Sequence, residues 1–159
     1  MARTVFVLVA LTAYAVDVLS KIWAVHRLAD GDIELIGDWL RLHLVRNPGA
    51  AFSTGEQFTV VFSLVAIVAA GVVLWLSRRL GNAAWAVAFG LLLAGICGNL
   101  TDRLLREPGP LRGHVVDLFA VPHWPVFNVA DMCIDVAAGL ILLQAFRNVR
   151  LDGTRGGSA

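Results

Sequence analysis

Five aspartates of this 159-residue chain lie within or beside strongly apolar stretches, where ionisable side chains are rare. A charged side chain at the centre of a bilayer costs about 2.5–3.5 kcal/mol on insertion scales, so each of these residues requires a partner or a chemical role. In chain order they are Asp17, Asp102, Asp117, Asp131 and Asp135. Their positions, and the amides near them, limit the chemistry that this sequence could perform.

Asparagine and aspartate recur three residues apart at two places, Asn99 with Asp102 and Asn128 with Asp131. That spacing puts both members of each pair on one face of a helix. Asp117 enters an apolar stretch between them, so we expect Asp102, Asp117 and Asp131 to converge at one boundary of a helical bundle. Carboxylates that meet in a medium of low dielectric constant cannot all ionise, and two that share a proton form the acid/base pair of aspartic proteases.

Three other interpretations of these acidic residues remain open on spacing alone. The aspartates could neutralise Arg103 and cap helix ends in a purely structural membrane protein. They could also carry protons or cations in a transporter, although the second apolar stretch offers almost no polar path. A metal site built on His114, His123 and Asp117 is less well supported, because these residues lie in a loop and lack the spacing of a helical histidine pair.

Asp17 and Lys21 are four residues apart in the first apolar stretch, where they can form an ion pair on one helix face. This pair is either a structural bridge near the membrane surface or a part of the site. Cys97 and Cys133 lie in apolar stretches without the spacing of a metal site, and we interpret them as small buried residues.

The composition indicates that lipid surrounds much of the chain. Hydrophobic residues make up 58% of it and charged residues 16%, whereas soluble domains are roughly half apolar and a quarter charged. A helix needs about 20 apolar residues to cross a bilayer core, and residues 5–23, 58–76, 83–100 and 126–146 meet this requirement. We therefore expect an all-α membrane protein with four transmembrane helices, forming one domain over residues 1–150, with a disordered cytoplasmic tail at 151–159.

The first apolar stretch also has features of a secretory signal peptide, because Arg3 and an apolar run precede small residues. The apolar character continues to Val25, which favours a membrane-spanning helix. Arg78 and Arg79 lie in a tight loop without acidic residues, and this favours a cytoplasmic position for that loop and for both termini. The net charge of +1 gives no indication of nucleic-acid binding.

Residues 25–57 make a connection too long for a simple loop, and part of it has the pattern of a β-strand. Residues 40–44 alternate apolar and polar side chains, residues 33–35 do so more briefly, and a turn at Gly37 could join the two. We expect a small extracytoplasmic β-hairpin or cradle on the membrane surface. The second outer connection, residues 106–125, is rich in proline and glycine and is expected to be a loop.

Five short motifs together resemble those of the lipoprotein signal peptidases (signal peptidase II), a family of bacterial intramembrane aspartic peptidases. In chain order they are Asp17-x-x-Ser20-Lys21, Asn47-Pro48-Gly49-Ala50-Ala51-Phe52, Gly98-Asn99-Leu100-Thr101-Asp102-Arg103, Val115-Val116-Asp117 and Phe127-Asn128-Val129-Ala130-Asp131. Each motif alone is weak, but five in this order on the expected elements are specific. The resemblance covers about residues 4–147.

The resemblance implies an aspartic endopeptidase of the bacterial plasma membrane, with both termini cytoplasmic and the active site on the extracytoplasmic side. It implies cleavage of diacylglyceryl-modified prolipoproteins just before the lipobox cysteine, by water that Asp117 and Asp131 activate. The residues that would bind substrate or support the site are Asp17, Lys21, Asn47, Gly49, Asn99, Asp102, Arg103, Asn128 and Ala130. Globomycin-type peptides are implied as inhibitors, no metal or organic cofactor is implied, and we expect a monomer without a nucleic-acid partner.

Two features depart from the family pattern. Asp117 and Asp131 are 14 positions apart, a shorter gap than we expect, although a tight connection through Pro122 and Pro125 could bring them together. Asp135 follows Asp131 by one helical turn, at a position where a neutral residue is expected. It could influence the titration of Asp131, or it could pair with a buried polar group.

Overall fold

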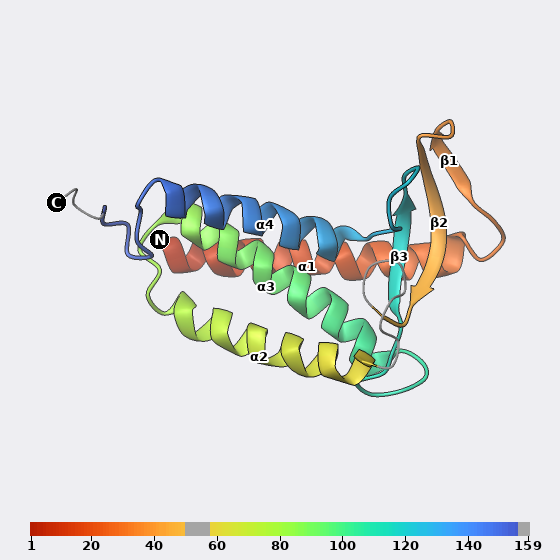
Figure 1. The fold of residues 1–159 in the computed structure, drawn as a ribbon, viewed down its shortest axis with the longest axis horizontal. Coiled ribbons are helices and arrows are strands. Elements are labelled where there is room, and N and C mark those ends of the chain that lie inside the picture. Colours follow the sequence, from red (N-terminus) through yellow and green to blue (C-terminus); the bar gives the residue numbers. More distant parts are fainter. Residues whose placement is uncertain (50–57, 156–159) are drawn as a thin grey trace.

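The computed structural model of the chain describes residues 1–49 and 58–155. Within them the elements follow in the order α1 (Ala2–Arg27), β1 (Ile33–Ile36), β2 (Leu40–Asn47), α2 (Thr59–Ser77), α3 (Ala83–Leu105), β3 (Val115–Ala120) and α4 (Val129–Phe146). The helices run along the long axis of the molecule, and the sheet lies across one end of the bundle (Figure 1). Both termini lie at the opposite end.

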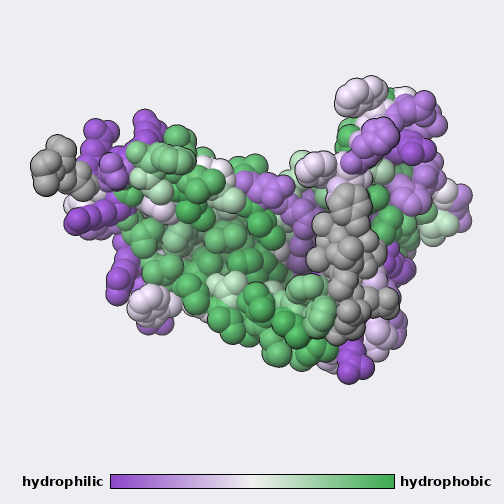
Figure 2. All heavy atoms as spheres, in the orientation of Figure 1, coloured by the Kyte–Doolittle hydropathy of each residue, from purple (hydrophilic) through white to green (hydrophobic). Residues whose placement is uncertain are grey.

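All four helices are long and apolar enough to cross a membrane. On the face that Figure 2 shows, apolar residues cover the middle of the bundle and hydrophilic residues gather at its two ends. Leu11, Leu19 and Val68 are more than half exposed on the helix surfaces, whereas the charged Asp17 and Lys21 are buried inside. Apolar side chains outside and charges inside are the distribution that lipid favours, because lipid solvates leucine and not lysine. The expected four-helix membrane fold is confirmed.

α3 is the central helix, and it packs against each of the other three. Gly98 makes one of these contacts possible. A Cβ atom added at Gly98 would collide with the Asp17 carboxylate of α1 and would lie 3.1 Å from the Cβ of Ala130 on α4. The absence of a side chain at this position therefore lets α1 and α4 approach α3 where the polar residues of the bundle gather.

The sheet is antiparallel in the order β1-β2-β3, so the expected hairpin of β1 and β2 is confirmed and a third strand is added to it. Gly37, at the hairpin turn, has a φ of 46°, a conformation that glycine adopts without strain. The expectation of a loop throughout residues 106–125 was wrong for β3. The first four residues of β3 are buried, so they show none of the apolar–polar alternation of a half-exposed strand.

The helix ends differ modestly from the sequence-based spans, since α3 continues to Leu105 and α4 begins at Val129. The beginning of the expected disordered tail, residues 151–155, forms a turn against the α2–α3 loop. The Gly81 amide donates to the Leu151 carbonyl at 2.9 Å, and the Arg150 amide donates to the Thr154 carbonyl at 2.8 Å. Residues 156–159 of that tail lie outside the described residues.

Candidate active site

A pocket of about 420 Å³ opens where α3 and α4 meet the sheet. Its polar wall includes Asn47, Asn99, Arg103, Asp117, Asp131 and Asp135. Trp124, Phe127 and Met132 contribute apolar surface to the same pocket. The pocket thus collects carboxylates and amides from β2 and from the three consecutive elements α3, β3 and α4.

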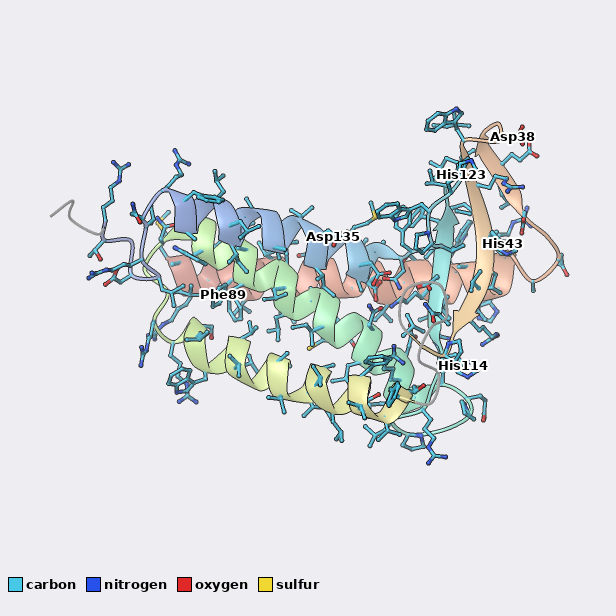
Figure 3. The ribbon with its side chains drawn as sticks, in the orientation of Figure 1. Asp38, His43, Phe89, His114, His123 and Asp135 are labelled. Carbon is cyan, nitrogen blue, oxygen red and sulfur yellow. The ribbon has the colours of Figure 1, made fainter. Side chains whose placement is uncertain are left out.

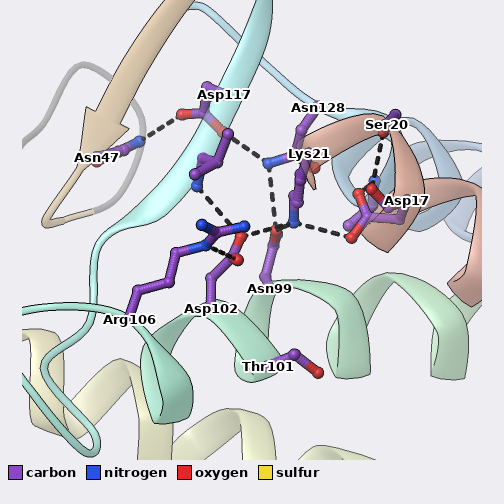
Figure 4. A network of polar contacts seen from close by, with 12 residues as sticks. Asp17, Ser20, Lys21, Asn47, Asn99, Thr101, Asp102, Arg106, Asp117 and Asn128 are labelled. Carbon is purple, nitrogen blue, oxygen red and sulfur yellow. Dashed lines mark hydrogen bonds and ion pairs between the residues drawn. The ribbon is translucent and has the colours of Figure 1, made fainter. Parts of the chain in front are cut away.

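Asp117 lies on β3, opposite Val45 of β2, and only 2% of its surface is exposed. Both of its oxygens accept hydrogen bonds from amides. Asn128 Nδ2 donates to Asp117 Oδ1 at 2.6 Å, and Asn47 Nδ2 donates to Oδ2 at 3.0 Å (Figure 4). Burial raises the pKa of Asp117 from 3.8 to about 6; the nearby charge of Asp131 adds to this rise, and the two amides oppose it.

Asp131 lies in the first turn of α4, where a capping box fixes its orientation. The Asn128 backbone N–H donates to Asp131 Oδ2 at 3.1 Å, and the Asp131 N–H donates to Asn128 Oδ1 at 3.0 Å. Asn99 Nδ2 of α3 donates to Asp131 Oδ1 at 2.8 Å. The start of α4 therefore holds the carboxylate in place, and its side chain is half-buried at the pocket.

Two asparagines join the two carboxylates through one hydrogen-bond chain. Asn128 Nδ2 donates to Asp117 Oδ1 and also to Asn99 Oδ1, at 3.2 Å in the second contact. Asn99 in turn donates to Asp131. Asn128 is fully buried, so its amide is held by protein groups alone.

A buried ion cluster contacts this hydrogen-bond chain at Asn99 (Figure 4). Lys21 Nζ lies 2.9 Å from Asp17 Oδ2 and 3.0 Å from Asp102 Oδ2, and it donates to Asn99 Oδ1 at 2.9 Å. Asp102 also pairs with Arg106, so the cluster holds two carboxylates and two cations. Balanced charge and shared hydrogen bonds offset the desolvation cost that each ion would otherwise incur.

The same cluster positions α4. The Ala130 backbone N–H donates to Asp17 Oδ1 at 2.8 Å, which ties the first turn of α4 to α1. The Val116 N–H donates to Asp102 Oδ2 at 3.2 Å, which ties β3 to α3. The ion pair expected between Asp17 and Lys21 is confirmed, and it acts beneath the strand and helix that carry Asp117 and Asp131.

Arg103 extends from α3 to the turn that follows β2. Its Nη2 donates to the Gly49 carbonyl at 2.7 Å, and the Gly49 N–H donates to Asn47 Oδ1 at 3.0 Å. Arg103 is 8% exposed, and its Nη1 has no hydrogen-bond partner among the described residues. Ala50, Ala51 and Phe52, the rest of this motif, lie outside those residues.

The short gap between Asp117 and Asp131 is explained by a tight return of the chain after β3. Phe127 pairs with Phe119 through two hydrogen bonds of 2.9 and 3.1 Å, and its carbonyl also accepts from the Leu118 N–H at 3.0 Å. Phe127 therefore adds a bridge to the free edge of β3, and Asn128 follows it directly. This return places the start of α4 beside the middle of β3.

Asp102, Asp117 and Asp131 gather at one end of the bundle as expected, since the Val116 N–H of β3 donates to Asp102 and Lys21 joins Asp102 to Asn99. Asp117 and Asp131 line the pocket, but Asp102 is turned toward Lys21 and Arg106. The ion pair of Arg106 with Asp102 was missed, although Arg106 follows Asp102 by four residues, the spacing that identified Asp17 with Lys21. Trp124 and Met132 were also missed as pocket residues, and no pattern in the sequence distinguished them from ordinary apolar positions.

The structure also bears on the remaining candidates. His114 and His123 lie well apart at the sheet end of the molecule (Figure 3). In residues 1–49 and 58–155, no three histidine, cysteine, aspartate or glutamate side chains are arranged to hold a metal ion. Cys97 and Cys133 are free; Cys133 is buried as expected, and Cys97 is partly exposed.

Comparison with known proteins places this geometry in a family. The family model of Signal peptidase (SPase) II matches residues 9–147. A lipoprotein signal peptidase of Leifsonia xyli subsp. xyli is 46% identical over 156 residues, which cover 97% of this chain and 72% of that protein. One of Streptomyces coelicolor is 48% identical over 147 residues, which cover 92% of this chain and 72% of that protein.

Two solved bacterial membrane enzymes share the fold. One superposes with a TM-score of 0.79 at 24% identity, over 96% of this chain and 94% of that chain. The other gives a TM-score of 0.78 at 25% identity, over 90% and 93% of the two chains. The whole arrangement of four helices and a terminal sheet is therefore shared with enzymes of bacterial membranes.

The family model extends over most of the chain and covers all five motifs completely, from Asp17 to Asp131. The relatives named above match over nearly the full chain, with spans in which almost half of the residues are identical. Their common activity is that of a peptidase that processes lipoproteins, and the four apolar helices agree with a membrane location. This chain is thus a multi-pass membrane peptidase that belongs to the lipoprotein signal peptidase (signal peptidase II) family.

Proposed function

We propose that this chain is an aspartic endopeptidase in which Asp117 and Asp131 are the catalytic pair. The observation that carries this proposal is the shared pocket, which both carboxylates line while Asn128 and Asn99 connect them. Two carboxylates in one low-dielectric pocket favour a state that holds a single proton. Arg103 also lines the pocket, and its positive charge balances the single negative charge of a carboxylate pair that holds one proton.

The proton starts on Asp117, because burial raises the pKa of that carboxyl to about 6. Ionised Asp131 takes a proton from water while the water oxygen bonds to the scissile carbonyl carbon. Protonated Asp117 supplies the proton that the amide nitrogen needs as the C–N bond breaks. The pair ends with one proton, as it began, and no acyl-enzyme forms.

The substrates are diacylglyceryl-modified prolipoproteins, cleaved just before the lipobox cysteine. Two observations support this substrate class. The relatives are named lipoprotein signal peptidases. The pocket lies at the sheet end of four apolar helices, where acyl chains can remain in lipid beside the bundle while the peptide enters the pocket.

The remaining site residues then have supporting roles. Asn47 and Gly49 form the mouth of the pocket beside Asp117, and Arg103 holds that turn and the substrate backbone. Asn99 and Asn128 orient the two catalytic carboxylates. The residues that brace α1, α3 and α4 beneath them are Asp17, Lys21, Asp102 and Ala130.

The orientation in the membrane follows from this function. Both termini lie in the cytoplasm, and the sheet with its pocket faces the extracytoplasmic side, where exported precursors present the scissile bond. The arginines at the end that holds the termini support this orientation. Residues 1–150 act as one domain and as a monomer, and globomycin-type peptides occupy the same pocket.

The test is incubation of the purified chain in detergent with a diacylglyceryl-modified precursor and with the same precursor lacking the lipid. Mass spectrometry should show a product that begins at the modified cysteine, and only from the lipidated precursor. Cleavage should persist with EDTA or phenanthroline. Cleavage of both precursors at equal rates would contradict the substrate class, and loss with chelator that zinc restores would contradict the carboxylate mechanism.

A further inference from the structure

Asp135 lines the same pocket as Asp117 and Asp131, but the catalytic pair does not require it. It lies on α4, four residues after Asp131, so both side chains lie on one face of the helix. Figure 3 shows it partway along α4, away from the sheet. Its side chain is exposed, in contrast to the buried Asp17, Asp102 and Asp117.

Asp135 differs from the other aspartates of the bundle in having no partner among the described residues. Asp17 and Asp102 pair with Lys21, and the two catalytic carboxylates accept hydrogen bonds from asparagines. Within residues 1–49 and 58–155, no side chain or backbone N–H donates to Asp135. Among these residues no donor reaches its acceptor oxygens, and Asp135 lines the pocket.

A free carboxylate within a membrane span is costly, so its presence favours a role in binding. A carboxylate accepts hydrogen bonds and donates none, so its ligand must bring a donor. The ester groups of a diacylglyceryl anchor offer only acceptors. The peptide part of the precursor offers backbone N–H groups and, at serine or threonine, hydroxyl groups.

The position of Asp135 indicates which part of the precursor it meets. Four residues of α-helix rise about 6 Å, and an extended peptide advances about 3.3 Å per residue. An extended substrate that runs along α4 from Asp131 would therefore meet Asp135 about two residues from the scissile bond. In the proposed orientation the residues that precede that bond would lead back into the membrane, in the direction from Asp131 to Asp135.

A hydrogen-bond donor for substrate carbonyl groups is available in the same pocket on Arg103. Its buried Nη1 has no partner among the described residues. Arg103 brings a donor for substrate carbonyl oxygens, and Asp135 brings an acceptor for substrate donors. An extended peptide needs both, because lipid satisfies neither its N–H nor its C=O groups.

We propose that Asp135 is a specificity-determining residue that accepts a hydrogen bond from a serine or threonine hydroxyl two residues before the scissile bond. This inference rests on the proposed function. Precursors with a hydroxyl side chain at that position bind more tightly than precursors with alanine, because alanine leaves the carboxylate without its donor.

The test compares two lipidated precursors that differ only in serine or alanine at that position. Each is cleaved by the wild type, Asp135→Asn, Asp135→Leu and, as a control on another face of α4, Val136→Leu. The wild type and the control should favour serine by about tenfold in kcat/KM, mainly through KM. Asp135→Leu should cleave both precursors equally, and Asp135→Asn, which keeps an acceptor oxygen, should retain part of the preference.

An unchanged serine preference in Asp135→Leu, or no preference in the wild type, would overturn this role for Asp135 while leaving the peptidase intact. So would an equal loss of rate on both precursors with a shifted pH profile, since that result would show that Asp135 acts through Asp131. Failure of the wild type to cleave either precursor would instead contradict the proposed function itself.

Discussion

At the scale of single residues, spacing predicted which polar side chains share a helix face, and the structure shows which groups on other elements they contact. The three-residue spacing of Asn128 and Asp131 fixes both on one turn, and the capping box follows from that spacing. The contact of the Asp102 carboxylate with Lys21 could not be predicted from spacing in the same way. Asp102 turns to Lys21 because α1 and α3 pack closely, and such a contact between distant segments leaves no periodic signal in either one.

Asn47 offers a residue-scale prediction about pH. Its amide donates to Asp117 and lowers the pKa of that carboxyl, which burial raises to about 6. If cleavage needs the shared proton, activity is lost as pH rises through an apparent midpoint near 6. Asn47→Leu removes the donor, so the pKa of Asp117 rises and this midpoint should move to higher pH, with a lower maximal rate.

The measurement is the pH dependence of kcat for wild type and Asn47→Leu on one precursor. Thr101→Val is the control, because the Thr101 hydroxyl bonds Tyr14 and the Cys97 carbonyl and does not touch Asp117. A midpoint that moves to lower pH in Asn47→Leu would show that the amide does not stabilise the ionised form.

At the scale of elements, apolar length predicted the helices and alternation predicted the β1–β2 hairpin. β3 was not predicted, because its sequence is a short apolar run interrupted by Asp117. A strand that is buried among other elements lacks the alternation of apolar and polar residues that identifies a half-exposed strand. The pairing of Phe127 with Phe119 was also hidden, although it brings the start of α4 to the site. Tertiary contacts determine both features, and local sequence patterns do not record them.

Helix packing gives the element-scale prediction. Gly98→Ala would force a methyl group against the Asp17 carboxylate and Ala130, and overpacking of this kind costs about 1–3 kcal/mol. Gly139→Ala is a matched control on α4, because nothing lies within 4 Å of a Cβ added there. The alanine at 139 should stabilise its helix by about 0.5–1 kcal/mol.

Thermal unfolding in detergent, with cleavage measured in parallel, distinguishes the two glycines. Gly98→Ala should unfold at a lower temperature and lose activity, while Gly139→Ala should do neither. Equal behaviour of the two variants would mean that close approach at Gly98 does not hold α1 and α4 in place.

At the scale of the whole molecule, composition was sufficient to predict a membrane protein. The structure agrees, because Asp17 and Lys21 are buried while apolar residues cover the middle of the face seen in Figure 2. The orientation of the bundle in the membrane was harder to predict, because arginines occur in the loops at both ends of the bundle. The structure places the termini together and the pocket at the other end, so one labelled position at each end determines the orientation.

The topology prediction uses single cysteines in a chain whose Cys97 and Cys133 are replaced by alanine. Asp38→Cys and Pro110→Cys, at the sheet end, should react with an impermeant reagent in intact cells. Arg78→Cys, in the opposite loop, should react only after lysis. The reverse pattern would place the pocket in the cytoplasm, on the wrong side for exported precursors.

The most direct test of the account is the cleavage rate of Asp117→Asn and Asp131→Asn on a diacylglyceryl-modified precursor, with Asp32→Asn, at an exposed position just before β1, as a control. Removing a general acid or base costs 10²–10⁴-fold, so each site variant should fall to about 1% of the wild-type rate or less while the control stays unchanged. All three should insert and unfold cooperatively like the wild type. A folded Asp117→Asn or Asp131→Asn that kept more than about a tenth of the wild-type rate would contradict the proposal that these two aspartates are the catalytic pair.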